Sequence, residues 1–317
     1  MKALHSCFAN YLTDFITLRR KLGCQFRDQA RILAEFDSFV ARSGHDGVPT
    51  VELALDFATA NPGLASSGHV RRFQLVRQFY DYLATFEPRT PLLDPRELRS
   101  PRTRFIAHIY AVAELGRLLQ EARTISRRNP IRGITLHAIV GLAASTGLRI
   151  GEIVRLDRAD VNLETGVMTL RRSKFSKDRL VPVHPSTLEA LRRYAAVRDA
   201  RYSQSGSAAF FLTLRGERFA RGTLEGDFCQ LTRRAGLRRA LARGPRFHDL
   251  RHTFAVRRLV AWYEEGADVQ AMLPVLATYM GHVCYTHTAY YLQATAELLG
   301  IAADRFQRSL HSGEVDR

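Results

Sequence analysis

Residues 247–292 read FHDLRHTFAVRRLVAWYEEGADVQAMLPVLATYMGHVCYTHTAYYL, and this stretch carries His248, Arg251, His282 and Tyr291 in that order. A guanidinium holds two phosphate oxygens at once through its planar fork, and an imidazole donates or accepts a proton near neutral pH. A tyrosine hydroxyl can act as a covalent nucleophile. These side chains are therefore suited to binding a phosphodiester and attacking it.

The same stretch predicts two helices. The first spans residues 249–265 and buries one apolar face, so Arg251 is expected on a different face. The residues expected on that face are Leu250, Phe254, Leu259 and Trp262. Proline is tolerated in the first turn of a helix, so Pro274 places the start of the second helix near Leu273. Gly281 ends that helix and presents the histidine that follows it.

The composition of the chain favours a polyanionic partner. Its 317 residues exceed the usual size of one domain and predict two. Lys+Arg 47 against Asp+Glu 31 gives a formal charge of +16 and a pI near 10.3, which favours nucleic acid. No apolar run approaches the roughly 20 residues that cross a bilayer, and the N-terminus lacks the apolar block of a signal peptide. We therefore expect a cytoplasmic protein without a membrane partner.

The cysteines do not indicate a disulfide framework or a metal site. Cys7, Cys24, Cys229 and Cys284 form no CxxC pair. The run 282–287 holds three donors close together, but structural zinc takes four ligands and no second cluster completes the set. We expect reduced thiols and no metal ion.

Residues 1–86 predict an all-helical domain of four helices, because apolar residues recur there at three- and four-residue spacing. These helices are strongly basic. The residues expected to contact nucleic acid are Arg19, Arg20, Lys21, Arg71 and Arg72. A basic loop at 236–246 adds Arg246 to this set. The alternative for each arginine is a solvated helix face.

Residues 87–104, EPRTPLLDPRELRSPRTR, differ in composition from the helical segments before them. Prolines at positions 88, 91, 95 and 101 interrupt helical periodicity, and arginines lie between them. The segment is predicted to be a stiff, extended linker between two domains, able to follow a phosphate backbone. The alternative is a solvated linker that does not contact nucleic acid.

Residues 105–310 predict a second, mixed domain, and 311–317 a flexible tail. The first expected helices span 112–127 and 134–146. Gly147 ends the second of these, and Arg149 follows just before a short helix that contains Glu152. The alternative to a catalytic role is that Arg149 and Glu152 form a buried ion pair that only stabilises the fold.

A β-hairpin is predicted next in the chain. GVMTLRR at 166–172 and RLVPVHP at 179–185 are β-like, and the intervening SKFSKD presents Lys174 and Lys177 at the tip. Lys177 is a further expected nucleic-acid contact. The alternative for such lysines is protection of a strand edge. AAFFLTL at 208–214 is expected to form a third strand.

These motifs together resemble the tyrosine recombinases, also called the phage integrase family. The matching motifs are TGLRIGE with Arg149, SKFSKDRLVPV with Lys174, HDLRH with His248 and Arg251, YMGH with His282, and Tyr291 nine residues after that histidine. The resemblance implies an α+β protein, mainly helical with a small β-sheet. Residues 1–86 look like the family's core-binding domain and 105–310 like its catalytic domain. LRRKLG, RFIAHIYAVAEL and LPVLATYMGHV look most like the transposon-encoded members.

Three tyrosines follow His282 and are candidates for the nucleophile. Tyr290 and Tyr291 are adjacent, and on a helix adjacent side chains point about 100° apart, so only one can face a phosphate. The spacing from His282 favours Tyr291, with Tyr290 as an aromatic packing neighbour. Tyr285 follows the histidine too closely to match.

The resemblance also implies a role for each residue. Arg149 and Arg251 would hold the non-bridging oxygens of the scissile phosphate, and His282 would hydrogen-bond the phosphate. His248 would accept the tyrosine proton or orient the site, and Lys174 would protonate the departing 5′ oxygen. Glu152, also in this set, braces the site rather than touching DNA. The product is a 3′-phosphotyrosyl bond, which stores the phosphodiester energy, so neither ATP nor another cofactor is expected.

The implied partner is double-stranded DNA at recombination sites, bound by a tetramer, with partner recombinases or DNA-bending proteins as further candidates. The apolar helix predicted at 294–308 packs either within its own subunit or on a neighbour. Two other functions stay open. One is an accessory DNA-binding subunit without cleavage, and the other is a type IB topoisomerase or telomere resolvase.

Overall fold

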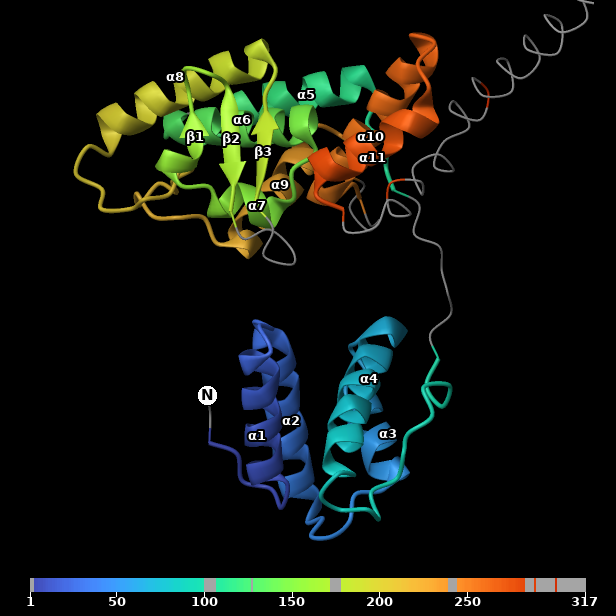
Figure 1. The fold of residues 1–317 in the computed structure, drawn as a ribbon. Helices are drawn as coiled ribbons and strands as arrows, with labels where there is room; N and C mark the ends of the chain where they lie inside the picture. The colour runs from blue at the N-terminus through green and yellow to red at the C-terminus, as the bar shows by residue number, and fades with distance from the viewer. Residues whose placement is uncertain are drawn as a thin grey trace, which may run out of the picture. The chain divides into compact units, whose positions relative to one another are not determined.

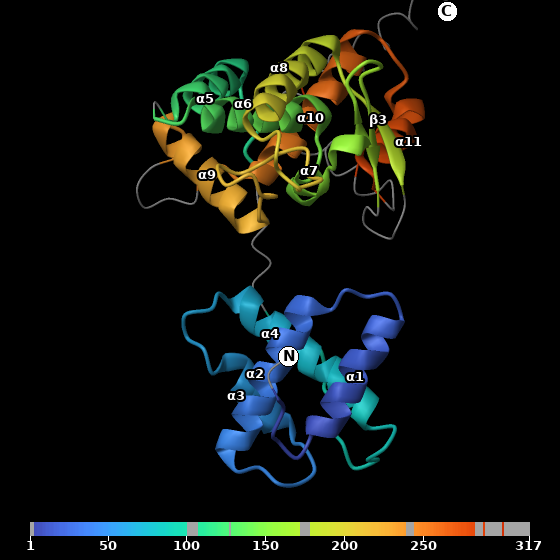
Figure 2. The same cartoon turned by 90° about the vertical axis from the view of Figure 1, so that its left-hand side faces the viewer.

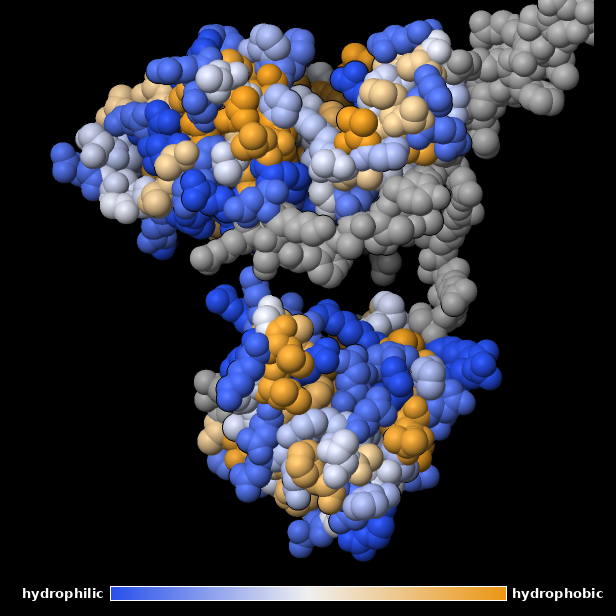
Figure 3. All heavy atoms as spheres, in the orientation of Figure 1, coloured by the Kyte–Doolittle hydropathy of each residue, from blue (hydrophilic) through white to orange (hydrophobic). Residues whose placement is uncertain are grey.

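The computed structural model describes residues 3–99, 107–126, 128–171, 178–238 and 244–282, together with Thr288 and Gly300. The chain divides into two compact units, Met1–Arg104 and Phe105–Arg317 (Figure 1). Hydrophilic residues dominate the face of each unit that is seen in Figure 3, with small apolar areas between them. Among the described residues, no helix is both long and apolar enough to cross a membrane.

The N-terminal unit is a bundle of four helices, as predicted. They are α1 (Ala9–Lys21), α2 (Arg27–Ser43), α3 (Val51–Thr59) and α4 (Ser66–Leu83). Aromatic rings fill its core: Phe36 lies 5.1 Å from Phe57 and 6.2 Å from Phe79, in edge-to-face geometry in both pairs. All three rings are fully buried. Such pairs add about 0.5–1.5 kcal/mol each beyond the area they bury, so the bundle has a well-defined core of its own.

Residues 87–99 pack on this bundle, which differs from the expectation of an extended linker. Leu93 is 4% exposed and belongs to the apolar core, with Leu98 packed against it. The Thr90 amide donates to the Glu87 carbonyl at 2.9 Å, which forms a turn. The apolar pair Leu92–Leu93 between the prolines thus gives this segment an anchoring side chain, because burying a leucine is favourable.

The C-terminal unit contains a small antiparallel sheet in the order β1-β2-β3. The strands are β1 (Val161–Asn162), β2 (Val167–Leu170) and β3 (Arg179–Pro182). Leu170 pairs with Arg179 and Val167 with Pro182, so the predicted hairpin is confirmed. Its tip, residues 172–177, lies outside the described residues.

The third strand predicted at 208–214 is wrong. That segment forms only two isolated bridges, Asp157 with Ala209 and Leu212 with Arg218, and the third strand of the sheet is β1. Phe210 and Phe211 are almost completely buried in the unit's core. The run is apolar because it is buried, and burial alone does not distinguish a strand from a core-packing loop.

Helices make up most of this unit and carry the rest of its core. In chain order they are α5 (Val112–Thr124), α6 (Pro130–Thr146), α7 (Ile150–Arg155), the 3-10 turn η1 (Arg158–Asp160), α8 (Pro185–Arg201), α9 (Arg221–Arg234), α10 (Phe247–Glu264) and α11 (Val269–Met280). The helix α6 packs against α5, α8 and α10 and is buried on nearly all sides (Figure 2). The end of α6 is therefore held deep in the unit.

The helix α11 begins at Val269, four residues earlier than the predicted start near Leu273. The Asp268 side chain caps it by accepting from the amides of Gln270 at 2.9 Å and Ala271 at 3.2 Å. Pro274 consequently lies inside the helix, where the missing N–H leaves the Gln270 carbonyl without its helical donor. Gln270 is exposed, so water can serve that carbonyl. The Asp268 cap therefore sets the start of α11, although Pro274 favours a later start.

Candidate active site

Two left-handed glycines direct the chain through the site. Gly147 (φ 64°) ends α6 as predicted, and the chain then passes to Arg149 at the start of α7. A side chain at Gly147 would meet the Phe254 ring at 2.6 Å, so only glycine fits. The Arg149 amide donates to Glu152 Oε2 at 2.9 Å, which fixes the first turn of α7.

The end of α11 leaves three backbone carbonyls facing the site. Gly281 (φ 66°) closes the helix, with the His282 amide donating to the Ala277 carbonyl at 2.9 Å and the Gly281 amide to the Thr278 carbonyl at 3.0 Å. This is a glycine-based C-terminal cap. The carbonyls of Tyr279, Met280 and Gly281 come next, at the C-terminal end of α11, where the regular pattern of intrahelical hydrogen bonds stops.

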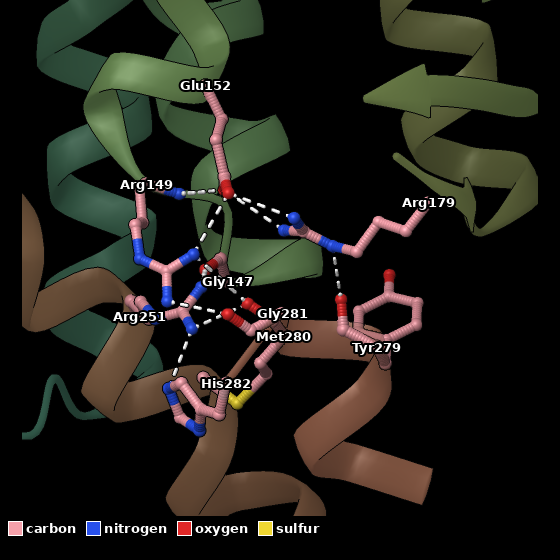
Figure 4. Close-up of polar contacts among 9 residues, drawn as sticks. All are labelled: Gly147, Arg149, Glu152, Arg179, Arg251, Tyr279, Met280, Gly281 and His282. Atoms are coloured by element: carbon pink, nitrogen blue, oxygen red, sulfur yellow. Dashed lines mark hydrogen bonds and ion pairs between the residues drawn. The ribbon is translucent and has the colours of Figure 1, made fainter. Parts of the chain in front are cut away.

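Three arginines donate to these three carbonyls (Figure 4). Arg179 Nε reaches the Tyr279 oxygen at 2.9 Å. Arg251 Nη2 reaches the Met280 oxygen at 2.7 Å, and Arg149 Nη1 is 3.4 Å from the same atom. Arg149 Nη2 reaches the Gly281 oxygen at 3.0 Å. The negative end of a helix dipole stabilises cations, so α11 gathers three guanidinium groups in one place.

Arg251 lies on α10 and is only 1% exposed. Besides Met280, it donates from Nη1 to the Gly147 carbonyl at 2.7 Å and from Nη2 to Nε2 of His282 at 2.8 Å. A buried charge is tolerated when hydrogen bonds replace its hydration. Arg251 therefore ties the ends of α6 and α11 together.

The bonds of His282 define its tautomer. A guanidinium can only donate, so Nε2 of His282 accepts from Arg251 and carries no proton. Nδ1 then holds the ring proton and donates it to Oγ1 of Thr288, 2.7 Å away. Thr288 is fully buried. In this state His282 is a neutral ring held by bonds on both sides.

Glu152 lies between Arg149 and Arg179. Its Oε1 accepts from Arg149 Nη1 and Arg179 Nη1, both at 3.0 Å, and its Oε2 accepts from Arg179 Nη2 at 3.0 Å. The Glu152 side chain is only 3% exposed. Burial alone raises the pKa of this carboxyl, but the hydrogen bonds and charges of the two arginines outweigh burial and lower the pKa. Three arginines and one glutamate give the cluster a formal charge of +2.

His248 lies one turn before Arg251 on α10, with part of its side chain exposed and the rest surrounded by protein. Desolvation by the surrounding protein, followed by the nearby His252 and the positive charges of Arg251 and Arg246, lowers the pKa of His248 to about 4. The His248 and His252 rings stand edge to face at 5.0 Å. His248 is thus neutral near pH 7 and able to accept a proton.

The structure brings together part of the predicted set. Arg149, Glu152, Arg251 and His282 form one hydrogen-bonded cluster, with His248 on the same helix as Arg251. Lys174, Lys177, Tyr285, Tyr290 and Tyr291 lie outside the described residues, as does the stretch 294–308 except for Gly300. Within the described part of the chain, no group of three or more His, Cys, Asp or Glu residues is arranged to hold a metal ion.

The basic residues expected at DNA differ in their surroundings. Arg20, Lys21 and Arg71 are exposed, whereas Arg19 is half-buried over the rings of Phe15 and Phe26. Arg246 pairs with the buried Asp249 at 3.0 Å and keeps 46% of its side chain exposed.

Arg72 requires a correction. It is 9% exposed, donates from Nη1 to Glu35 Oε2 at 2.6 Å and stacks 4.0 Å above the Phe57 ring. Its guanidinium is therefore engaged within the bundle rather than presented to a DNA backbone. The basic helix α4 placed Arg72 in the predicted set, but its neighbour Arg71 is the one on the exposed face.

Arg179 was missed by the sequence analysis. Its signal is positional: in RLVPV it lies two residues before Val181, and alternate residues of a strand share a face. Val181 is fully buried, so Arg179 also points inward. An arginine on the buried face of a strand needs an acidic partner, which here is Glu152.

Comparison with known proteins places the chain in a family. The phage integrase family pattern matches residues 111–297. The chain is 44% identical over 306 residues to a protein of Sinorhizobium fredii provisionally named integrase/recombinase y4rE, covering 95% of this chain and 97% of that protein. It is 31% identical over 249 residues to the tyrosine recombinase XerD of Rhizobium meliloti, covering 76% and 74%. The chain therefore belongs to the phage integrase family.

Solved structures agree in fold. The Tn1549 transposon integrase in complex with a circular intermediate DNA has a TM-score of 0.64 at 15% identity, over 93% of this chain and 99% of that one. The XerH site-specific recombinase bound to a difH substrate has a TM-score of 0.64 at 18% identity, over 88% and 79%. The mainly helical fold with a small sheet is thus the tyrosine recombinase fold, and the predicted fold class is confirmed.

Proposed function

We propose that this protein is a site-specific DNA recombinase that cuts and rejoins strands through a 3′-phosphotyrosyl intermediate. The observation that supports this most is the convergence of Arg149 and Arg251 on one oxygen acceptor beside His282, in a chain of the phage integrase family. Two guanidiniums aimed at one point are suited to the non-bridging oxygens of a phosphodiester.

In the proposed reaction, the oxygens of the scissile phosphate accept the N–H groups of Arg149 and Arg251 that bind backbone carbonyls in the DNA-free protein. Arg149 and Arg251 stabilise the extra negative charge of the pentacoordinate transition state. The Tyr291 oxygen attacks phosphorus, and the bond from phosphorus to the 5′ oxygen breaks. His248, neutral at pH 7, accepts the tyrosine proton, and Lys174 gives a proton to the departing 5′ oxygen.

The His282 tautomer adds a requirement to this scheme. Nε2 now accepts from Arg251, so it can donate to a phosphate only after Arg251 Nη2 turns to the phosphate and the ring proton is rearranged or a second proton is taken up. Phosphate binding therefore changes the partners of both residues together.

The biological setting that we propose is the movement of a mobile element in the cytoplasm, where DNA is the substrate. Support comes from neighbours in fold: one is a transposon integrase with a circular intermediate DNA, and another is a lambda integrase tetramer bound to a Holliday junction. Two duplexes with two cuts on each call for a tetramer on DNA. Exposed Arg20, Lys21, Arg71 and Arg246 are the proposed DNA contacts among the described residues.

A nicked suicide substrate carrying the element's end sequence tests the proposal. Wild type should form a protein–DNA adduct that survives SDS, Tyr291→Phe should form none, and the neighbouring control Tyr290→Phe should form as much as wild type. Tight binding by wild type without any adduct would contradict the proposal and favour an accessory DNA-binding role. Relaxation of supercoils on arbitrary DNA without exchange between sites would favour a type IB topoisomerase.

A further inference from the structure

We infer that Arg179 is a positioning residue for DNA cleavage: it holds Arg149 and the Gly281–His282 turn in the geometry that grips the scissile phosphate. This inference rests on the proposed function. Arg179 does not itself touch the DNA, because its side chain is only 10% exposed and its fork is taken up by Glu152.

Each of the three donor atoms of Arg179 has a partner in the cluster. Nη1 and Nη2 bind the two oxygens of Glu152, each at 3.0 Å, and Nε binds the Tyr279 carbonyl at 2.9 Å. This arrangement needs a planar group with donors on two sides. Lysine has a similar charge but no fork, and it cannot make the same set of bonds.

Arg179 acts on Arg149 by sharing the carboxylate. Both Glu152 oxygens also accept from Arg149, one from its side chain at 3.0 Å and one from its amide at 2.9 Å. Without Arg179, the carboxylate would be free to take both Nη groups of Arg149, because bidentate pairing is the stronger geometry. Arg149 would then turn away from the Gly281 carbonyl and from a phosphate.

The charge of the cluster also supports a role for Arg179 in the cleavage step. Arg149, Arg179 and Arg251 with Glu152 carry a formal +2, and loss of the Arg179 charge leaves +1. A phosphate passing to its transition state gains negative charge, so this difference acts mostly on the cleavage step.

Arg179 also shapes the turn that presents His282. A side chain on Gly281 would lie 2.6 Å from Arg179 Nη1, so the guanidinium packs directly on this glycine. The Tyr279 hydroxyl donates to the Pro182 carbonyl at 3.1 Å, a second tie between β3 and the end of α11. The turn is thus fixed from the strand side as well as by Arg251.

Single-turnover cleavage by saturating enzyme on the suicide substrate tests the inference with Arg179→Lys and Arg179→Gln. The matched control is Arg218→Gln, since Arg218 also binds a carboxylate, of Asp157, and two backbone carbonyls at the other end of α7, of Val154 at 2.9 Å and Leu156 at 3.3 Å. We expect both Arg179 variants to cleave roughly 10- to 100-fold more slowly, with DNA affinity within about twofold of wild type. The control should cleave at the wild-type rate.

A second substrate separates positioning from a general loss of structure. It carries a neutral methylphosphonate at the scissile position, which needs less cationic stabilisation. If Arg179 acts through the arginine geometry, the ratio of wild-type to variant rates should fall to within about threefold on this substrate. An equal ratio on both substrates, or a wild-type rate for Arg179→Lys, would overturn the inference. Absence of any wild-type adduct on the phosphodiester would instead refute the proposed function, and the inference with it.

Discussion

Arg149 and Arg251 donate to the same atom, the carbonyl oxygen of Met280, at 3.4 and 2.7 Å. They come from different helices, yet both guanidiniums are oriented by a single backbone acceptor at the end of α11. A carbonyl oxygen and a phosphate oxygen both accept hydrogen bonds from a guanidinium group. The DNA-free protein therefore keeps its two arginines close to the arrangement that a phosphate requires, which lowers the reorganisation needed when DNA binds.

Arg251→Lys should abolish most cleavage and destabilise the C-terminal unit. The variant keeps the charge but loses the bonds to Gly147 and His282 that a planar fork makes, which costs about 1–3 kcal/mol of stability and on the order of 10²–10³ in cleavage rate. Urea unfolding followed by Trp262, the only tryptophan, reports this unit. Arg258→Lys on the exposed face of α10 should stay within about 0.5 kcal/mol of wild type.

Gly281→Ala should destabilise the C-terminal unit more than Gly266→Ala does. Both glycines end a helix with positive φ, 66° and 75°, so both substitutions carry a left-handed backbone cost of about 1–2 kcal/mol. At Gly266 an added Cβ meets nothing within 4 Å, whereas at Gly281 it lies 2.6 Å from Arg179. The excess loss for Gly281→Ala, about 1 kcal/mol or more, isolates the displaced arginine. Equal losses in Trp262 unfolding would show that Arg179 moves aside freely.

Local chemistry explains what the sequence predicted correctly. Gly147 and Gly281 end their helices because each adopts a left-handed conformation, and the segments flanking SKFSKD pair because they have β-type composition around a polar turn. These signals lie within a few residues of the feature they determine. The grouping of Arg149, Arg251 and His282 was predicted in another way, through the resemblance of their motifs to those of the tyrosine recombinases.

Tertiary partners explain what the sequence did not predict. Pro274 is tolerated inside α11 because Asp268 fixes an earlier start, and residues 208–214 are apolar because they fill the core. The acceptors that orient the arginines are backbone carbonyls, which every residue possesses, so no residue type signals them. The sequence signals that Arg179 faces inward, but its partner Glu152 is 27 residues away in the chain and is brought beside it only by the fold.

Arg72→Ala should destabilise the N-terminal unit, whereas Arg71→Ala should weaken DNA binding. Arg72 loses its bond to Glu35 and its position over Phe57, at a cost on the order of 1–3 kcal/mol. Arg71 is exposed, and its loss should leave stability within about 0.5 kcal/mol. Far-UV circular dichroism follows unfolding of both units, and Trp262 fluorescence shows that the C-terminal unit is unaffected. A stable Arg72→Ala variant with reduced DNA affinity would restore Arg72 to the DNA-contacting set.

The imidazole of His248 should titrate with a pKa of about 4. Its folded pKa lies below the ordinary value of 6.5, so the unfolded chain binds more protons between the two values, and this residue makes folding less favourable as pH falls through that window. Carbon-13 NMR of histidine-labelled protein measures the pKa, with His248→Gln identifying the resonance. A midpoint near 6.5 would show that burial and the neighbouring positive charges do not lower the pKa of His248.

Glu152→Gln should remove a pH-dependent part of the stability of the C-terminal unit. The folded pKa of this carboxyl lies below its ordinary value of 4.5, so its stabilisation is fully present above pH 4.5 and is lost as pH falls through the folded pKa. At pH 7 the variant leaves two arginines facing a neutral amide, which costs about 3–5 kcal/mol for a buried pair. Asp160→Asn is the matched control, because Asp160 is also buried and binds one arginine, Arg171, at 2.7 Å, away from the cluster. The unfolding free energies of wild type and Glu152→Gln, measured through Trp262 from pH 7 to pH 3.5, should converge as pH falls. A gap that stays constant or widens on acidification would mean that the charge of Glu152 does not stabilise the arginine cluster.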